Sequence, residues 1–86
     1  MDNIEIRDDA IDFLQRQATE LSNRARVPLN DRGAELQHRE LDRRASAAGS
    51  TVSWLAALDD QGFWEQVKKV NRELQNINRG LTRLGL

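Results

Sequence analysis

Few side chains in this sequence could perform chemistry, and those few stand apart from one another. His38 is the only histidine, and the nearest approach to a pair of carboxylates is Asp59-Asp60. A metal site at His38 would need carboxylate ligands from other helices, and no spacing in the sequence selects them. Helix capping explains Asp59-Asp60 more simply than acid–base catalysis does. We therefore predict no catalytic residue and no metal ligand, and a structural or partly exposed position for His38.

Motifs for cofactors and activated nucleophiles are also missing from the sequence. There is no glycine-rich phosphate loop and no Ser/His/Asp motif. The chain has no cysteine, which excludes disulfides, thiol chemistry and thiolate metal sites. These absences lead us to predict a protein that is not an enzyme and needs no cofactor.

Length and composition indicate one small soluble domain. The 86 residues are close to the size at which a single hydrophobic core is only just sufficient. The first residues, MDNIEIRDD, are acidic where a signal peptide would be basic and then apolar. The longest apolar run, Trp54 to Leu58, is far too short to span a membrane. We expect a cytoplasmic protein that does not interact with membranes.

Charged residues are nearly balanced in number but unevenly placed. Residues 1–12 carry five acidic side chains against one arginine, and residues 66–86 carry five basic side chains against one glutamate. This pattern favours matching of helix dipoles and mutual attraction of the two ends. A charged docking face is the alternative that the sequence leaves open.

Three stripes of apolar residues recur with helical spacing and predict the elements that must position any site. In chain order, the stripes are Ile11, Leu14, Ala18, Leu21, Ala25; then Ala34, Leu41, Ala45, Ala48, Val52, Leu55; then Phe63, Val67, Val70, Leu74, Ile77, Leu81, Leu84. Short connections between the stripes imply a small all-α antiparallel bundle, because no stripe can be left facing water. The predicted bundle has three to four helices, at about residues 8–26, 32–48, 51–59 and 61–80.

Caps and helix breakers predict the ends of these helices. The expected caps, in chain order, are Asp8 or Asp9 (with Asp2 as a competing earlier signal), Asn30 or Asp31, and Asp59 or Asp60. Val27-Pro28 should end the first helix. The whole chain is predicted to be a single domain, with fraying expected in residues 1–7 and 81–86.

The glycines bear on two helix boundaries, one near Gly49 and one near the C-terminus. Gly49-Ser50-Thr51 resembles a helix stop followed by a new N-cap. The second apolar stripe nevertheless keeps its helical phase across this point, and a glycine inside a helix costs only about 1 kcal/mol. The middle two helices are therefore either continuous or separate. Near the C-terminus we expect fraying at Gly80, and Gly85 lies too close to the end to contribute.

Two other architectures use the same helices. The a/d spacing of the third stripe would allow a coiled-coil dimer, so we expect a monomer or a weak homodimer. The segment ASAAGSTVSWLAAL has features of a helix-turn-helix. Its recognition helix, Val52 to Gln61, would contain two aspartates and no lysine or arginine, and phosphates would repel it. We expect no direct binding of nucleic acid.

The stretch SWLAALDDQGFW holds three of the four aromatic residues. Phe63 lies on the third stripe, which predicts a core position. Trp54 and Trp64 each lie one residue off a stripe, about 100° around the helix, so both should flank the core. They either close the end of the bundle around the turn or, with Leu58, form an exposed patch that binds another protein.

The C-terminal segment GLTRLGL is a second candidate surface. Its leucines could dock on the bundle or insert into a groove of a partner, and docking is the simpler of the two. The residues predicted to contact a partner are therefore Trp54, Leu58, Trp64, Leu81 and Leu84.

In its size, its cysteine-free helical make-up and its SWLAALDDQGFW segment, the chain resembles the small helical antiactivators of bacterial quorum sensing and mobile-element transfer. The resemblance implies stoichiometric binding to a transcriptional activator, often of the LuxR type, which prevents DNA binding or activation. Our leading hypothesis is a small non-catalytic regulatory protein that binds another protein. A self-assembling helical protein and a helix-turn-helix regulator are the alternatives.

Overall fold

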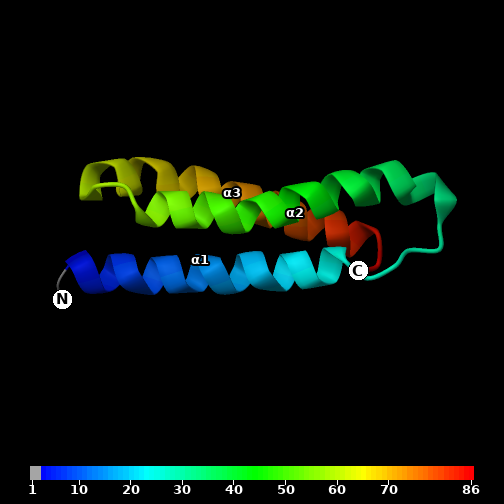
Figure 1. Ribbon diagram of the computed structural model, residues 1–86, viewed down its shortest axis with the longest axis horizontal. Coiled ribbons are helices and arrows are strands. Elements are labelled where there is room, and N and C mark those ends of the chain that lie inside the picture. The colour runs from blue at the N-terminus through cyan, green and yellow to red at the C-terminus, as the bar shows by residue number, and fades with distance from the viewer. Residues whose placement is uncertain (1–2) are drawn as a thin grey trace.

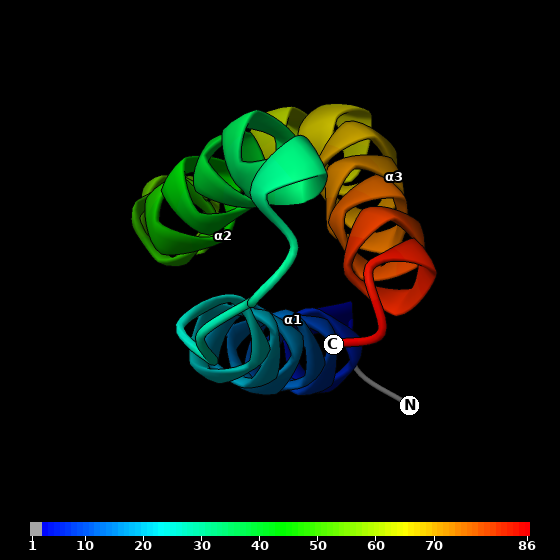
Figure 2. The ribbon, with the colours of Figure 1, turned by 90° about the vertical axis from the view of Figure 1, so that its right-hand side faces the viewer.

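The computed structural model describes the backbone of residues 3–86 and the side chains of residues 6–86. Three long helices follow one another, α1 (Asn3–Ala25), α2 (Glu35–Ala56) and α3 (Asp60–Arg83), and a short 3-10 helix, η1 (Arg32–Ala34), precedes α2. Successive helices run in opposite directions, so α1 and α3 are parallel to each other (Figure 1). Seen along the long axis the helices form a triangle (Figure 2), and the bundle measures 48 × 18 × 16 Å. The predicted all-α antiparallel bundle is confirmed.

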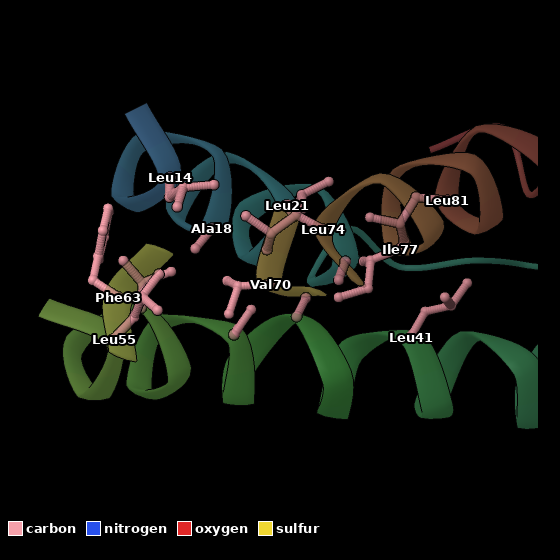
Figure 3. Close-up of a cluster of buried hydrophobic side chains, with 14 residues drawn as sticks. Leu14, Ala18, Leu21, Leu41, Leu55, Phe63, Val70, Leu74, Ile77 and Leu81 are labelled. Carbon is pink, nitrogen blue, oxygen red and sulfur yellow. The ribbon is translucent and has the colours of Figure 1, made fainter. Parts of the chain in front are cut away.

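The core lies between the three helices, and each of its buried side chains belongs to one of the predicted apolar stripes (Figure 3). The buried residues are Leu14, Ala18, Leu21, Ala25, Leu41, Ala45, Ala48, Val52, Leu55, Phe63, Val70, Leu74, Ile77 and Leu81. Burial of one leucine- or phenylalanine-sized side chain contributes about 1.5–3 kcal/mol, so these residues provide the main stabilising free energy. Alanines on α1 and α2 allow close approach, and α1 packs most extensively on α2 and least on α3.

Helix α1 begins earlier than the cap residues predicted. Asp8 and Asp9 lie inside the helix, so neither caps it. The competing signal at Asp2 agrees better with the observed start, but Asp2 itself lies outside the described residues. The other end of α1 is at Ala25, just before the predicted stop at Val27-Pro28.

The other two predicted cap positions each resolve to one aspartate. Asp31 accepts a hydrogen bond from the backbone N–H of Gly33 at 2.9 Å and begins η1. Asp59 accepts one from the backbone N–H of Gly62 at 2.7 Å and begins α3. In both cases the side-chain oxygen satisfies a backbone donor that the new helix leaves unpaired.

Gly49 does not break the second helix, so the two middle helices left open by the sequence are one. The hydroxyl of Thr51 donates to the carbonyl of Ala47 at 3.1 Å, and the hydroxyl of Ser53 donates to the carbonyl of Gly49 at 3.1 Å. These residues therefore bond back to the preceding turn of the same helix instead of capping a new one. A Cβ at Gly49 would have no neighbour within 4 Å, which places this glycine on the open surface of α2.

Gly80 lies in the middle of a close helix contact, and the prediction that the chain frays there is wrong. Helix α3 continues past it to Arg83. A Cβ at Gly80 would lie only 2.7 Å from Cδ2 of Leu41, so the glycine makes room for this leucine between α2 and α3. Its role comes from tertiary packing, which the local sequence does not reveal.

Gly85 ends α3 in a complete Schellman motif, contrary to the expectation that it has no effect. Its φ of 80° lies in the left-handed region that glycine adopts easily. The N–H of Gly85 donates to the carbonyl of Thr82 at 3.0 Å, and the N–H of Leu86 donates to the carbonyl of Leu81 at 2.9 Å. The end of the chain thus folds back onto the helix, where Leu86 packs against the core.

Arg7 of α1 ties the turn between α2 and α3 to the first helix. Its Nη1 donates to Oδ1 of Asp60 at 2.7 Å, and its Nη2 donates to the carbonyls of Ala56, at 3.0 Å, and Leu58. Its guanidinium carbon lies 4.8 Å from the centre of the Phe63 ring, a cation–π distance. Because these carbonyls have no donor within α2, Arg7 satisfies them and fixes the start of α3.

Arg24, at the other end of α1, ties this helix to the C-terminal end of α3. Its Nε donates to the backbone oxygen of Leu86 at 3.0 Å, and its Nη2 donates to Oγ1 of Thr82 at 3.1 Å. Its Nη1 also donates to Oδ1 of Asn78. The two arginines therefore fasten α1 to α3 at both ends.

The acidic N-terminal segment and the basic C-terminal tail lie at opposite ends of the bundle, because α1 and α3 run in the same direction (Figure 1). The start of the basic segment nevertheless lies level with α1, where Lys68 borders the same groove as Ala10, and no ion pair joins residues 6–12 to residues 66–86, so the mutual attraction of the two segments stays a prediction. Attraction between surface charges is therefore limited to side chains that lie close together on neighbouring helices.

Candidate protein-binding surfaces

Three of the four aromatic side chains lie outside the core. Phe13 is 56% exposed, Trp54 51% and Trp64 40%, whereas Phe63 is fully buried. The predictions that Phe63 belongs to the core and that both tryptophans flank it are confirmed. In so small a protein, three half-exposed aromatic side chains are an unusual amount of apolar surface in contact with water.

Trp54 lies beside a groove between α2 and α3. The wall formed by α2 includes Ala47 and Thr51. Trp54 follows Thr51 by three residues, so both lie on one edge of α2, and Leu58 lies in the turn just beyond the end of that helix. The groove has a volume of about 410 Å³.

The floor of this α2/α3 groove is apolar and one side of it is bridged by an ion pair. Val70 and Leu74 of α3 lie beneath it and belong to the core. The Nε of Arg44 donates to Oε1 of Glu73 at 2.7 Å, which joins the two helices across the groove. Both charged side chains are only partly exposed. The groove is therefore a shaped apolar surface with a fixed polar rim.

Trp64 lies over a different groove, between α1 and α3. This groove has a volume of about 240 Å³, and its walls include Phe13 of α1 and Val67 and Lys68 of α3. Trp64 precedes Val67 by three residues and Lys68 by four, so it lies on the same face of α3. The ring of Trp64 also meets Phe63 edge to face, with the ring centres 4.8 Å apart.

The structure thus divides the predicted patch of Trp54, Leu58 and Trp64 between two grooves. Trp54 and Leu58 lie along the α2/α3 groove, and Leu58 is half-buried against the core. Trp64 lies beside the α1/α3 groove, as Phe13 does. That these residues contact a partner stays a prediction.

The C-terminal leucines belong to the bundle. Leu81 is fully buried in the core, and Leu84 is half-buried against it. Because the capping motif folds the end of the chain inward, Leu81 is not available to a partner, and its prediction as a binding residue is corrected. Leu81 and Leu84 therefore dock on the bundle of their own chain, as the simpler of the two alternatives predicted.

Two exposed apolar residues at or beside the α1/α3 groove were not predicted from the sequence. Phe13 precedes the core residue Leu14 by one position, as Trp64 follows Phe63 by one. Ile6, which is 39% exposed, precedes the groove residue Ala10 by four positions. The criterion that singled out the tryptophans, a large apolar residue just off a stripe, would have found Phe13 as well.

His38 has the structural role that the sequence indicated. Its Nε2 donates to the backbone carbonyl of Ala25 at 2.7 Å, so this nitrogen carries the proton and joins the start of α2 to the end of α1. Within residues 6–86, His, Asp and Glu side chains form no cluster of three or more that could hold a metal ion. None of the described helices combines the length and the apolar content needed to cross a membrane.

Neither alternative architecture fits the geometry. A helix-turn-helix needs a turn near Gly49, where α2 is continuous, and the segment Val52 to Gln61 is itself interrupted by the turn before α3. A coiled-coil dimer through the third stripe would need that stripe at the surface, and most of it is buried inside the bundle.

Comparison of the chain with protein-family models, with curated protein sequences and with solved structures finds no match in any of the three. The resemblance to antiactivators therefore stays a prediction. What can be proposed about function depends on the geometry of the two grooves.

Proposed function

We propose that the protein is a small non-catalytic regulator that acts in the cytoplasm by binding another protein through the α2/α3 groove and Trp54. The observation that supports this proposal is the position of Trp54. Its side chain is half-exposed, and among the described residues it has neither the aromatic contact that Trp64 makes nor a cation–π contact. Tryptophans in such positions are enriched among the residues that dominate binding energy.

The shape of the surface favours a helix as the bound element. Ala47, Thr51 and Trp54 follow one another at steps of four and three residues along α2, which gives an edge of two small side chains and one large apolar side chain about two turns long. An amphipathic helix laid along this edge could place its own apolar side chains at matching intervals. Trp54 would contact it near one end, and the Arg44–Glu73 pair would border it near the other.

The partner we propose is a transcriptional activator, which the protein would hold in an inactive complex. This step follows from the resemblance to the antiactivators and from no contact seen here. Such a regulator works stoichiometrically, because each bound copy occupies one activator and no reaction turns it over. The expected effect on the activator is loss of DNA binding.

The proposal can be tested by affinity capture from nuclease-treated lysate of the native host. The wild-type chain should recover an activator, and Trp54→Ser should recover at least about tenfold less, as expected for a residue that dominates binding. Leu36→Ser is the matched control, because Leu36 is an 81% exposed apolar residue at the distant end of the same helix. Circular dichroism should show the same helicity for all three proteins.

A gel-retardation assay with the captured activator then tests the regulatory part of the proposal. Adding the wild-type chain should release the activator's DNA in proportion to the amount added, with an end point near one chain per activator. Equal capture by Trp54→Ser would move the binding site away from the α2/α3 groove. Captured proteins unrelated to transcription would contradict the antiactivator role and leave the binding role standing.

A further inference from the structure

The α1/α3 groove has an apolar middle that the fold leaves uncovered. Phe13, Trp64 and Ile6 border it, and all three are exposed to water by about two-fifths or more. Toward the other end, Phe13 also borders a polar continuation of the groove that includes Gln17 and Asn78. The apolar part is thus confined to the half of the groove near the N-terminus of α1.

The two helices that border this groove carry opposite charges. On α1, Asp9 precedes Phe13 by four residues and Glu20 follows Gln17 by three, so both lie on the groove edge. Both are exposed, and neither forms an ion pair with another side chain within residues 6–86. Arg16 and Arg24 of α1 lie nearby, but Arg16 pairs with Asp12 and Arg24 is bound to Asn78, Thr82 and Leu86, so the charges that lack such partners on the groove edge of α1 are acidic.

The groove edge of α3 is basic. Lys68 is itself a wall residue, Arg72 follows it by four positions, and Arg79 follows the wall residue Gln75 by four. All three cations are exposed and lack an ion-pair partner in the described part of the chain. The surface therefore consists of an acidic edge, an apolar centre and a basic edge.

We propose that this surface pairs with the same surface of a second copy of the chain, about a two-fold axis parallel to the helices. Because α1 and α3 run in the same direction, such an axis lays α1 of each copy against α3 of the other at the same level. Acidic edges then meet basic edges on both sides, and the two Phe13–Trp64 centres cover each other. An axis across the groove would instead place like charges face to face.

The proposed pairing differs from the coiled coil considered for the third stripe, because it uses residues outside the core. It also does not depend on the proposed function. The α2/α3 groove lies on the other side of α3, so Trp54 stays accessible in both copies of the dimer.

Sedimentation equilibrium tests the pairing directly. The wild-type chain at about 1 mM, a concentration at which even a millimolar interface is half-filled, should show a weight-average mass clearly above that of one chain, which rises toward that of two chains as the concentration increases. Phe13→Ser should raise the dissociation constant at least about tenfold, and Trp54→Ser should leave it unchanged. A wild-type mass of one chain would overturn the proposal, as would a dimer that Phe13→Ser does not weaken.

A charge exchange tests whether the charged edges hold the two copies together. The double variants Lys68→Glu/Arg72→Glu and Asp9→Lys/Glu20→Lys should each be monomeric, because each sets like charges against like. Mixed in equal amounts, they should form a heterodimer with the mass of two chains. If the mixture stays monomeric while the wild type dimerises, the charged edges do not face each other and the proposed pairing is wrong. Circular dichroism on each variant separates loss of pairing from loss of folding.

Discussion

The two grooves on either side of α3 differ although they share that helix. The α2/α3 groove has small wall residues on α2, a bridging Arg44–Glu73 pair and a tryptophan without an aromatic contact. The α1/α3 groove has a half-exposed phenylalanine, a tryptophan stacked edge-on against the core, and edges of opposite charge. The first therefore suits a foreign helix, and the second suits a copy of itself.

The lesson concerns the residues one position off each apolar stripe. The stripes contain every buried residue of the described chain, although some of their members, such as Ile11 and Val67, are only half-buried. The neighbouring positions determine what each outer groove offers to other molecules. Trp54 and Trp64 are only ten residues apart in sequence. Trp54 on α2 nevertheless lies beside the α2/α3 groove, and Trp64 on α3 lies beside the α1/α3 groove.

The largest effect is expected from truncation of Phe63, which should destabilise the whole bundle and with it both grooves. Phe63 is fully buried in the first turn of α3, and it contacts Arg7 of α1 and Trp64. Truncation of a buried phenylalanine costs about 3–5 kcal/mol, so Phe63→Ala should lose much of the free energy of unfolding. A domain of this size has only about 4–13 kcal/mol in total. Urea denaturation followed by circular dichroism measures the loss, and a loss below about 1 kcal/mol would contradict the packing described.

Substitutions at two glycines should act in opposite directions and locate the tight helix contact. Gly80→Ala forces a Cβ against Leu41 and should destabilise the fold by about 1–3 kcal/mol. Gly49→Ala, which meets no neighbour, should stabilise it by about 0.5–1 kcal/mol. Thermal unfolding of both variants checks the signs. Leu41→Ala combined with Gly80→Ala should recover part of the clash energy, and equal effects of the two glycine variants would contradict the close approach.

The smallest effect sharpens the contrast between the two tryptophans. Trp64→Ser loses an edge-to-face contact with a core ring, which costs about 0.5–1.5 kcal/mol beyond the area that it buries. Trp54→Ser loses no such contact, so its effect on stability should be the smaller of the two. The free energies of unfolding in urea give the comparison. A larger loss for Trp54→Ser would mean that this residue serves the fold more than a partner.

Much of the fold could be predicted from the sequence, because burial acts on a helix through its 3.6-residue period. All buried residues lie on the predicted stripes, and the caps at Asp31 and Asp59 are among those predicted. Two local sequence signals, the hydroxyl residues after Gly49 and the glycine at position 80, indicated helix ends that do not exist. Hydroxyl groups after Gly49 bond back within α2 and so do not start a new helix, and Gly80 is small because Leu41 of another helix needs the space.

The candidate surfaces were harder to predict for a geometric reason. A three-helix bundle can place its third helix on either side of the first two, and the stripes alone do not say which. Only when that side is known can an off-stripe residue be assigned to a groove. Trp54 and Trp64 were therefore predicted only to flank the core. One of the two interpretations left open placed them in a single patch, which the structure divides, and the pairing of Trp64 with Phe13 was not predicted.

The central claim is that the two sides of α3 have separate roles, and it is tested most directly by affinity capture with two single variants side by side. Phe13→Ser and Trp54→Ser each remove one half-exposed aromatic side chain, one from each groove. Our account predicts that Phe13→Ser recovers the host partner as well as the wild type does, while Trp54→Ser loses it. Recovery by Trp54→Ser together with loss by Phe13→Ser would contradict the account and assign partner binding to the α1/α3 groove.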